Sequence, residues 1–486
     1  MDDSKLVRQI SAMDGRERER LRQFVHSPYF NRHEGTSLLL DFLLKELSKA
    51  RPKLVEARAQ DAVKGGGSGQ KLPDLMSGLM KLVNRFLAVE QLREETFRGE
   101  VLTLKRTREL QRYELLGNRG KRLDRKVEKH KYRDGETHLA AYEWKAINGY
   151  HISNIDRSNT KEMQAMLDHL DRFYLVEKLR HACQLTANMM LMNTQYDLLF
   201  LDGIISFLGS EKGELLRKDD AEPSIDCYYH IFLSLREPDD VTHYERMRYY
   251  LDAGVDLLPL EHQKDVFGFA TNYCIQRIMS GFADYRMELL SLYRRGIDTE
   301  IIYNKGLISE WDYKNIATIG RVTNEVEWTA GFIENHRARL PEDKRENAYA
   351  LNKADFLYNL KRLEEAEKLL ITVTDSDVKY HLARVILQVK IAYDQEDQEY
   401  ALNLLETFRL YVARNKNISA NDKKSYTNYV RFSKQLVNLK HQRLFMDRAL
   451  YKKRLASLHE TIQETSLLVS RPWLIRESRP QESVTV

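Results

Sequence analysis

The fold is decided by ALNKADFLYNLKRLEEAEKLL (350–370) and by VILQVKIAYDQEDQEYALNLL (385–405), two stretches that begin 35 residues apart. Small and large apolar residues recur at matched positions in them: Ala354 with Val389, Tyr358 with Tyr393, Ala366 with Ala401, and Leu369–Leu370 with Leu404–Leu405. A period near 34 is typical of helix–turn–helix repeats, in which a small residue lets two helices approach and large residues fill the space beside it. We therefore predict that Ala366 and Ala401 are buried where paired helices cross.

A weaker third copy precedes these two, because Ala330 lies 36 residues before Ala366. Within the repeat, RLEEAEKLL (362–370) resembles the second helix of a tetratricopeptide repeat, although the usual Trp-Leu-Gly cluster and terminal proline are missing. The resemblance covers about residues 325–410. It implies a tetratricopeptide-like α-solenoid of antiparallel helix pairs.

Four further motifs extend the resemblance over most of the chain: FVHSPYFN (24–31), LMSGLMKLVNRFLAVEQ (75–91), LDRFYLVEKLRHAC (170–183) and RPWLIRE (471–477). Together with the repeats, they resemble a family of uncharacterised helical proteins from Bacteroidota. The resemblance implies a fold and not an activity, and it transfers no catalytic residue.

Proline usage also favours helices. The 486 residues contain nine prolines, with none between Pro73 and Pro223 or between Pro341 and Pro472. Proline breaks helix interiors, because it lacks an N–H donor and clashes with the preceding turn. Alternating β-branched runs joined by Asn-Gly or Asp-Gly turns are not found. We predict an all-α protein.

We divide the chain into a helical N-terminal domain (1–150), the α-solenoid (151–475) and a disordered tail (476–486). In the first domain, Asp14 and Glu17 have the spacing of a capping box at a helix start. Residues 51–72 are expected to form a flexible loop, and its GGGSG (65–69) is either a native loop or an artificial linker. Residues 159–192 are expected to form two amphipathic helices.

Motifs for catalysis or cofactor binding are missing. The sequence has no P-loop, no GxGxxG, no GxSxG and no HExxH. We therefore predict a non-enzymatic protein without a cofactor, a metal or a small-molecule substrate. No apolar run approaches the roughly 18 residues of a membrane span, and the first residues do not form a signal peptide. We expect a cytoplasmic protein with no membrane partner.

A few polar residues and thiols were weighed as sites. Glu177 and His181 lie four residues apart and are interpreted as a surface contact, and Asp168, His169 and Asp171 as a solvated face. The three cysteines are interpreted as small core residues and not as nucleophiles: Cys183, Cys227 and Cys274.

The net charge of +5 conceals two basic segments. Residues 105–133 carry +8 and residues 414–454 carry +10, which leaves −13 for the rest of the chain. Clustered Lys and Arg are the electrostatic footprint of polyanion binding. The candidate polyanion-binding residues are Arg122, Arg125, Lys126, Lys129, Arg133, Lys452, Lys453 and Arg454.

The basic segments leave two functions open. Segment 414–454 interleaves aromatic residues, which stack bases in some nucleic-acid-binding proteins. However, Tyr429, Phe432 and Leu436 have helical spacing, which favours a buried face with Lys and Arg in solvent. We therefore favour a scaffold or adaptor that binds a protein or peptide, with nucleic-acid binding (RNA, ribosome or DNA) through the two basic segments as the alternative.

Overall fold

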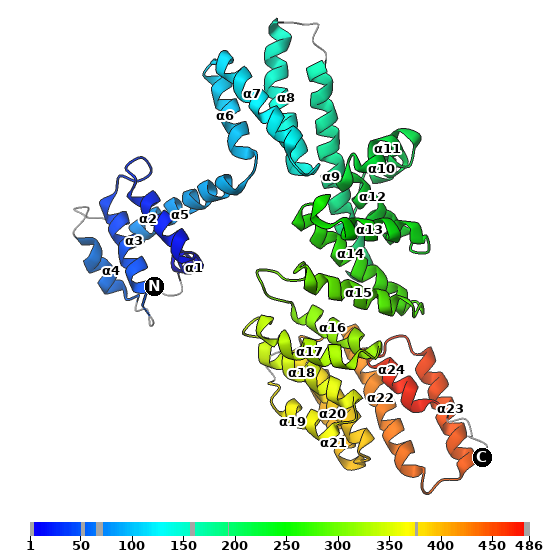
Figure 1. Ribbon diagram of the computed structural model, residues 1–486. Helices are drawn as coiled ribbons and strands as arrows, with labels where there is room; N and C mark the ends of the chain where they lie inside the picture. The colour runs from blue at the N-terminus through cyan, green and yellow to red at the C-terminus, as the bar shows by residue number, and fades with distance from the viewer. Residues whose placement is uncertain are drawn as a thin grey trace. The chain divides into compact units, whose positions relative to one another are not determined.

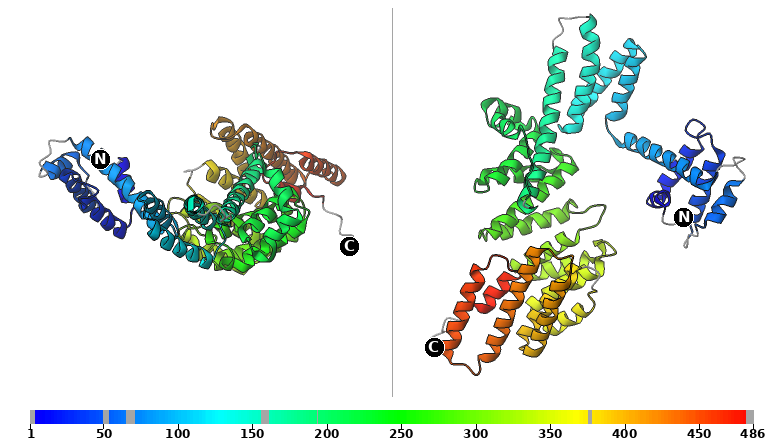
Figure 2. Two further views of the ribbon diagram at one scale, coloured as in Figure 1. Left: turned by 90° about the horizontal axis from the view of Figure 1, so that it is seen from above. Right: turned by 180° about the vertical axis from the view of Figure 1, so that it is seen from behind.

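The computed structural model describes residues 4–49, 54–64, 71–155, 161–192, 194–374 and 378–480. These residues form twenty-four α-helices and three short 3-10 turns, with no strand among them apart from an isolated bridge between Asn304 and Leu307 (Figures 1 and 2). The predicted all-α class is confirmed.

The chain divides into two compact units, Met1–Tyr229 and His230–Val486. The predicted boundary at residue 150 instead lies inside a helix, α8. The first unit contains α1 (Lys5–Ser11), α2 (Gly15–His26), α3 (Glu34–Leu47), α4 (Glu56–Val63), α5 (Leu72–Glu94), α6 (Arg98–Glu109), α7 (Tyr113–Lys129), α8 (Gly135–Ile155), α9 (Lys161–Met192), α10 (Leu201–Leu208), α11 (Glu211–Arg217) and the start of α12 (Pro223–Arg236). The second unit contains the end of α12, α13 (Val241–Ala253), α14 (Leu260–Met279), α15 (Tyr285–Asp298), α16 (Glu310–Val322), α17 (Val326–Asn335), α18 (Arg345–Asn359), α19 (Leu363–Ile371), α20 (Val378–Asp394), α21 (Gln398–Arg414), α22 (Ala420–Gln442), α23 (Arg448–Glu464) and α24 (Arg471–Ser478).

Helices α1–α5 share one apolar core. The predicted capping box is present at the start of α2, where the Asp14 carboxylate accepts the Glu17 N–H at 2.8 Å and the Glu17 carboxylate accepts the Asp14 N–H at 2.9 Å. These bonds satisfy two N–H groups that a helix start otherwise leaves unpaired. The cap fixes the start of the helix that buries Leu21, Phe24 and Val25.

The predicted loop at 51–72 is wrong in part, because it contains α4, and α5 begins at its last residue. Ala59 and Val63 are one helical turn apart, and both are buried where α4 packs on α3. Gly65–Gly69 and the tail residues 481–486 lie outside the described residues. The predicted tail is also too long, because α24 extends to Ser478.

Helices α6, α7 and α8 form a second core in the first unit. Gly120 of α7 faces the ring of Trp144 on α8, so close that a Cβ atom at this position would lie 1.8 Å from the ring. Helix α9 is one continuous helix packed along α8, and not the predicted two. It contains no proline or glycine to interrupt it.

Three consecutive helix pairs in the second unit are joined by the same turn. Asn324, Lys361 and Glu396 each adopt a left-handed conformation, with φ of 61°, 60° and 62°. The next residue of each turn donates its N–H back into the preceding helix: Glu325 to the Gly320 carbonyl at 2.9 Å, Arg362 to Leu357 at 3.0 Å, and Asp397 to Ala392 at 3.0 Å. This is the backbone pattern of a Schellman helix end. It relates α16–α17, α18–α19 and α20–α21.

The turns also settle the register of the repeat. Ala366 and Ala401 lie five residues after Lys361 and Glu396, and both are fully buried, as predicted. Five residues after Asn324 lies Thr329, which is also fully buried. The predicted third copy at Ala330 is therefore displaced by one residue. Thr329 is tolerated in the core because its hydroxyl donates to the Glu325 carbonyl at 2.6 Å.

Helices α20–α24 share a core that includes Tyr429, Phe432 and Leu436, so the predicted buried face of α22 is confirmed. Helix α24 is tied to the repeat region by Trp473, whose indole N–H donates to the hydroxyl of Tyr358 on α18 at 3.1 Å. The C-terminal helix thus packs against elements more than a hundred residues earlier in the chain.

Candidate functional site

A cavity of about 910 Å³ opens between helices of the second unit, and we name it the α16–α22 groove. Its walls come from α16, α18, α20, the start of α22 and the residues just before α24. On α16, the lining residues Trp311, Lys314, Thr318 and Arg321 follow each other at spacings of three and four, which places them on one face of the helix. The cavity is therefore lined mainly by helical faces, with loop residues at its edge.

Helix α20 contributes the longest face. Lys379, Ala383, Ile386 and Lys390 line the groove from one end of this helix to the other. Apolar side chains thus lie between two lysines. A ligand in the groove would meet an apolar middle with a positive charge at each end of α20.

Lys390 is a half-buried cation of the groove. It makes no hydrogen bond and no ion pair with any described residue, and its Nζ lies 6.0 Å from the ring centre of Trp473. Burial lowers the pKa of Lys390 below its usual value, and Asp355 only partly opposes this effect. An ammonium group has three N–H donors, and those of the half-buried Lys390 are not used by any described residue. An anion bound in the groove would accept hydrogen bonds from this group.

Asp355, the nearest acidic residue, is directed to another cation. Its Oδ2 lies 3.4 Å from Nε of Arg321, and Arg321 also donates from an Nη to the Asn359 side chain at 3.2 Å. Because the Asp355 carboxylate pairs with Arg321, Lys390 has no direct ion pair with it. This end of the groove is thus basic.

The other end of the groove is aromatic. Trp311 is about half exposed, and the ammonium of Lys379 lies 4.5 Å from its ring centre. The Glu310 carboxylate at this end accepts a hydrogen bond from the Tyr380 hydroxyl. A partly exposed tryptophan with a fixed cation beside it is suited to contact with an apolar or aromatic side chain.

The structure divides the predicted basic residues of the first segment. Arg122, Arg125 and Lys129 are exposed, and they lie on the side of α7 opposite its buried face. This face carries high positive charge. We name these three residues the α7 basic face.

Lys126 and Arg133 have intramolecular partners instead. Lys126 donates to the Thr96 carbonyl at 2.6 Å and to Glu100 at 3.0 Å. Arg133 donates to the carbonyls of Val127 and Glu128 at 3.0 and 3.3 Å, and so satisfies the end of α7. These two side chains hold α7 in place.

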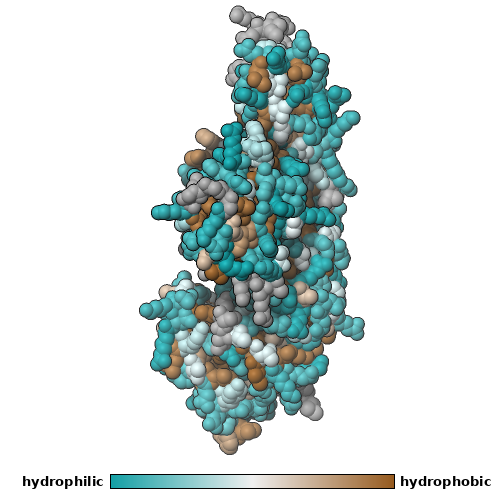
Figure 3. Space-filling model, turned by 90° about the vertical axis from the view of Figure 1, so that its left-hand side faces the viewer, coloured by the Kyte–Doolittle hydropathy of each residue, from teal (hydrophilic) through white to brown (hydrophobic). Residues whose placement is uncertain are grey.

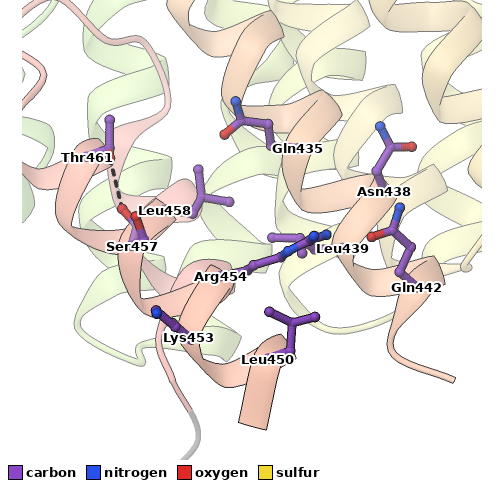
Figure 4. Close-up of a pocket in the computed structure, with 10 residues that line it drawn as sticks. All are labelled: Gln435, Asn438, Leu439, Gln442, Leu450, Lys453, Arg454, Ser457, Leu458 and Thr461. Carbon is purple, nitrogen blue, oxygen red and sulfur yellow. Dashed lines mark hydrogen bonds between the residues drawn. The ribbon is translucent and has the colours of Figure 1, made fainter. Parts of the chain in front are cut away.

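The second predicted group lies on α23. Lys453 and Arg454 line an open hollow of about 540 Å³ between α22 and α23, where Arg454 extends toward α22 (Figure 4). Lys452 is half-buried beside them. The two predicted groups belong to different units of the chain.

The prediction that His169 lies on a solvated face is wrong. His169 of α9 is half-buried, and its Nδ1 lies 3.2 Å from Nδ1 of His138, whose Nε2 lies 2.9 Å from Glu222. Burial, together with the charge of the neighbouring His138, lowers the pKa of His169 to about 4. By contrast, Glu177 and His181 form a surface contact at 3.6 Å, as expected.

The three cysteines are buried free thiols, as predicted. Burial raises the pKa of Cys274 to about 12, so this thiol is protonated and a poor nucleophile near neutral pH. Across the described ranges, no three His, Cys, Asp or Glu side chains are grouped closely enough to hold a metal ion. Nor does this part of the chain contain a helix with the length and apolar character to cross a membrane.

Comparison with known proteins found no matching family model, no matching curated protein and no matching solved structure. The tetratricopeptide and Bacteroidota resemblances therefore gain no support from these comparisons.

Sequence reasoning missed the α16–α22 groove, because its residues come from helices that are distant in sequence. The face of α16 gave one usable signal. Trp311, Lys314 and Arg321 share that face, where a tryptophan is not needed to fill the core. Which residues lie opposite them is decided only by the packing of α18 and α20.

Proposed function

We propose that this protein is a non-enzymatic scaffold or adaptor that binds a protein or peptide segment in the α16–α22 groove. The observation that carries the proposal is Lys390, a half-buried cation in a large groove with no hydrogen-bonding partner among the described residues. The groove therefore favours a segment that brings an acidic group to Lys390 and apolar side chains to Trp311 and Ile386.

The proposal includes an architecture. We propose that α16–α21 are antiparallel pairs of a tetratricopeptide-like α-solenoid. The recurrent left-handed turns and the buried Ala366 and Ala401 support this, since each pair repeats the geometry of the one before. In such a solenoid, the first helices of successive pairs line one extended surface, which is suited to an extended ligand.

A peptide library tests the proposed function. The full chain would select peptides from a random displayed library, and the affinity of each selected peptide would be measured by fluorescence anisotropy. We expect peptides with an acidic residue near apolar ones. Lys390→Met should weaken their binding at least about tenfold, because a charge-assisted hydrogen bond is lost. The matched control, Arg125→Met on the α7 basic face, should bind as the wild type does. Equal affinity for the Lys390→Met variant would refute the groove as the binding site.

Nucleic-acid binding is the second candidate function. It is favoured by the exposed Arg122, Arg125 and Lys129 on one face of α7. Phosphate backbones bind such faces through counterion release, which makes the affinity steeply salt-dependent. The buried Tyr429 and Phe432 cannot stack bases, so the support from segment 414–454 is weaker than its composition indicates.

A further inference from the structure

The turn between α22 and α23 exposes two large apolar side chains next to each other. Leu444 is 83 % exposed and Phe445 is 81 % exposed. The surface that faces the viewer in Figure 3 is mainly hydrophilic, with apolar residues in small separate areas. Exposing an adjacent leucine and phenylalanine is unfavourable in water, unless another surface covers them.

The turn has a defined conformation. The N–H groups of Phe445 and Met446 both donate to the Gln442 carbonyl, at 3.0 and 2.9 Å. On the other side, the Asp447 carboxylate accepts the N–H groups of Ala449 and Leu450, both at 3.0 Å, and so caps α23. Leu444 and Phe445 thus project from a hydrogen-bonded turn between two helix ends.

Positive charge surrounds this turn. Residues 440–454 contain six Lys or Arg residues and one acidic residue, Asp447, whose carboxylate caps α23. Glu396 and Asp397, just before α21, line a cavity with Arg443 and Leu444, and Glu396 lies 3.5 Å from Lys440, so basic residues outnumber acidic ones here without being alone. Arg443 directly precedes the apolar pair, Arg448 follows it three residues later, and both are exposed. Further along α23, Lys453 and Arg454 are also exposed.

The basic surroundings distinguish this turn from another exposed apolar pair. In the first unit, Leu199 and Phe200 are also well exposed at the start of α10. The nearest charged residues in sequence are acidic there, namely Asp197 and Asp202. Apolar exposure is thus common to both places, and only the turn between α22 and α23 combines it with positive charge.

We propose that the turn between α22 and α23 docks on an anionic lipid surface. Leu444 and Phe445 would enter the interfacial layer, and Arg443 and Arg448 would contact the phosphate and carboxylate groups of the lipids. Peripheral binding of this kind needs apolar side chains close to basic side chains, and it does not need a membrane-spanning helix. The apolar pair projects outward from a turn, a shape that a fluid surface accommodates without a preformed pocket.

Vesicle co-sedimentation of the full chain tests this proposal. Vesicles with about 30 % phosphatidylserine in phosphatidylcholine would be compared with pure phosphatidylcholine vesicles at about 0.1 M salt, where surface potentials still act. We expect binding to the anionic vesicles only. The Leu444→Ser/Phe445→Ser variant and the Arg443→Glu/Arg448→Glu variant should each lose at least about tenfold in affinity.

The matched control is Leu199→Ser/Phe200→Ser, which removes an equally large apolar pair from acidic surroundings and should bind as the wild type does. Thermal melting would confirm that each variant folds, which is expected because the substituted side chains are exposed. Absence of wild-type binding would overturn the proposal, and so would equal binding to both vesicle types. It would also fail if the Leu444→Ser/Phe445→Ser variant bound normally. Competition by single-stranded RNA would in that case identify the surface as a general polyanion site.

Discussion

The α7 basic face and the α16–α22 groove place positive charge in opposite ways. Segment 105–133, which includes α7, has a net charge of +8, and its exposed Arg122, Arg125 and Lys129 extend into solvent. The groove has an almost balanced lining, with four basic and three acidic residues: Lys314, Arg321, Lys379 and Lys390, against Glu310, Asp355 and Asp422. Yet it is in the groove that a half-buried ammonium lacks a partner. Charge density along a sequence therefore identifies solvated faces, whereas an unsatisfied cation depends on which helices meet.

The energetic difference follows from solvation. An exposed arginine keeps its water, and its contribution to stability is close to zero. Lys390 has lost part of its water, and Asp355 opposes this only in part. A ligand therefore gains more from one contact with Lys390 than from one contact with the α7 basic face.

The largest expected effect concerns how α7 is held. In Gly120→Ala, the new methyl group meets the Trp144 ring and should destabilise the protein by about 1–3 kcal/mol in urea unfolding. Gly117→Ala, three residues earlier in the same helix, meets no atom within 4 Å and should instead stabilise it by about 0.5–1 kcal/mol. If Gly120→Ala left the free energy of unfolding unchanged, α7 would not be held against Trp144. The α7 basic face would then have no fixed orientation.

The second prediction concerns the free-energy cost of the half-buried Lys390. Lys390→Met keeps the length of the side chain and removes the charge, so it should stabilise the free protein by about 1 kcal/mol. Arg125→Met should change the stability by less than about 0.5 kcal/mol, because its site is exposed. Urea unfolding of both variants measures the contrast. If Lys390→Met is destabilising, its ammonium has a favourable interaction in the free protein, and the two regions do not differ as described.

The pH dependence of stability tests whether the pKa of Lys390 is lowered in the folded protein. The folded-state pKa of Lys390 is lowered, so between that value and the unfolded value near 10.5 the unfolded chain binds more protons. Stability contributed at this site should therefore rise as the pH increases through that window. The comparison is between the wild type and Lys390→Met, because other groups titrate equally in both. The stabilising effect of Lys390→Met should shrink toward high pH, and a constant difference would contradict the assigned direction.

The smallest effect concerns the α7 basic face. With Lys126 and Arg133 engaged inside the protein, about three phosphate contacts remain, which predicts a log–log salt slope of about −2 to −2.7 for RNA or DNA binding. Arg122→Glu/Arg125→Glu/Lys129→Glu should abolish that binding and leave the helical circular dichroism unchanged. A slope of −4 or steeper would show that more of segment 105–133 contacts the nucleic acid.

Local features were predictable because they depend on neighbours in sequence. The capping box at Asp14 and the buried Ala366 follow from spacing alone. Features set by tertiary packing were not. His169 looked solvated among acidic neighbours, but its partner His138 lies on another helix. The third repeat was placed at Ala330 because the alignment relied on alanine, whereas the buried position five residues after the turn at Asn324 is a threonine, Thr329.

The three left-handed turns have a consequence for how such a chain diverges. Asn324, Lys361 and Glu396 hold the same backbone shape with three different side chains, each at a cost of roughly 1–2 kcal/mol relative to ordinary helical geometry. The turn does not require one particular side chain, so the residue at this position can change while the turn keeps its shape. Two helix pairs can therefore share a turn of the same backbone shape without sharing residues there. A search that matches φ angles and backbone hydrogen bonds would detect related helix pairs long after residue identity has decayed.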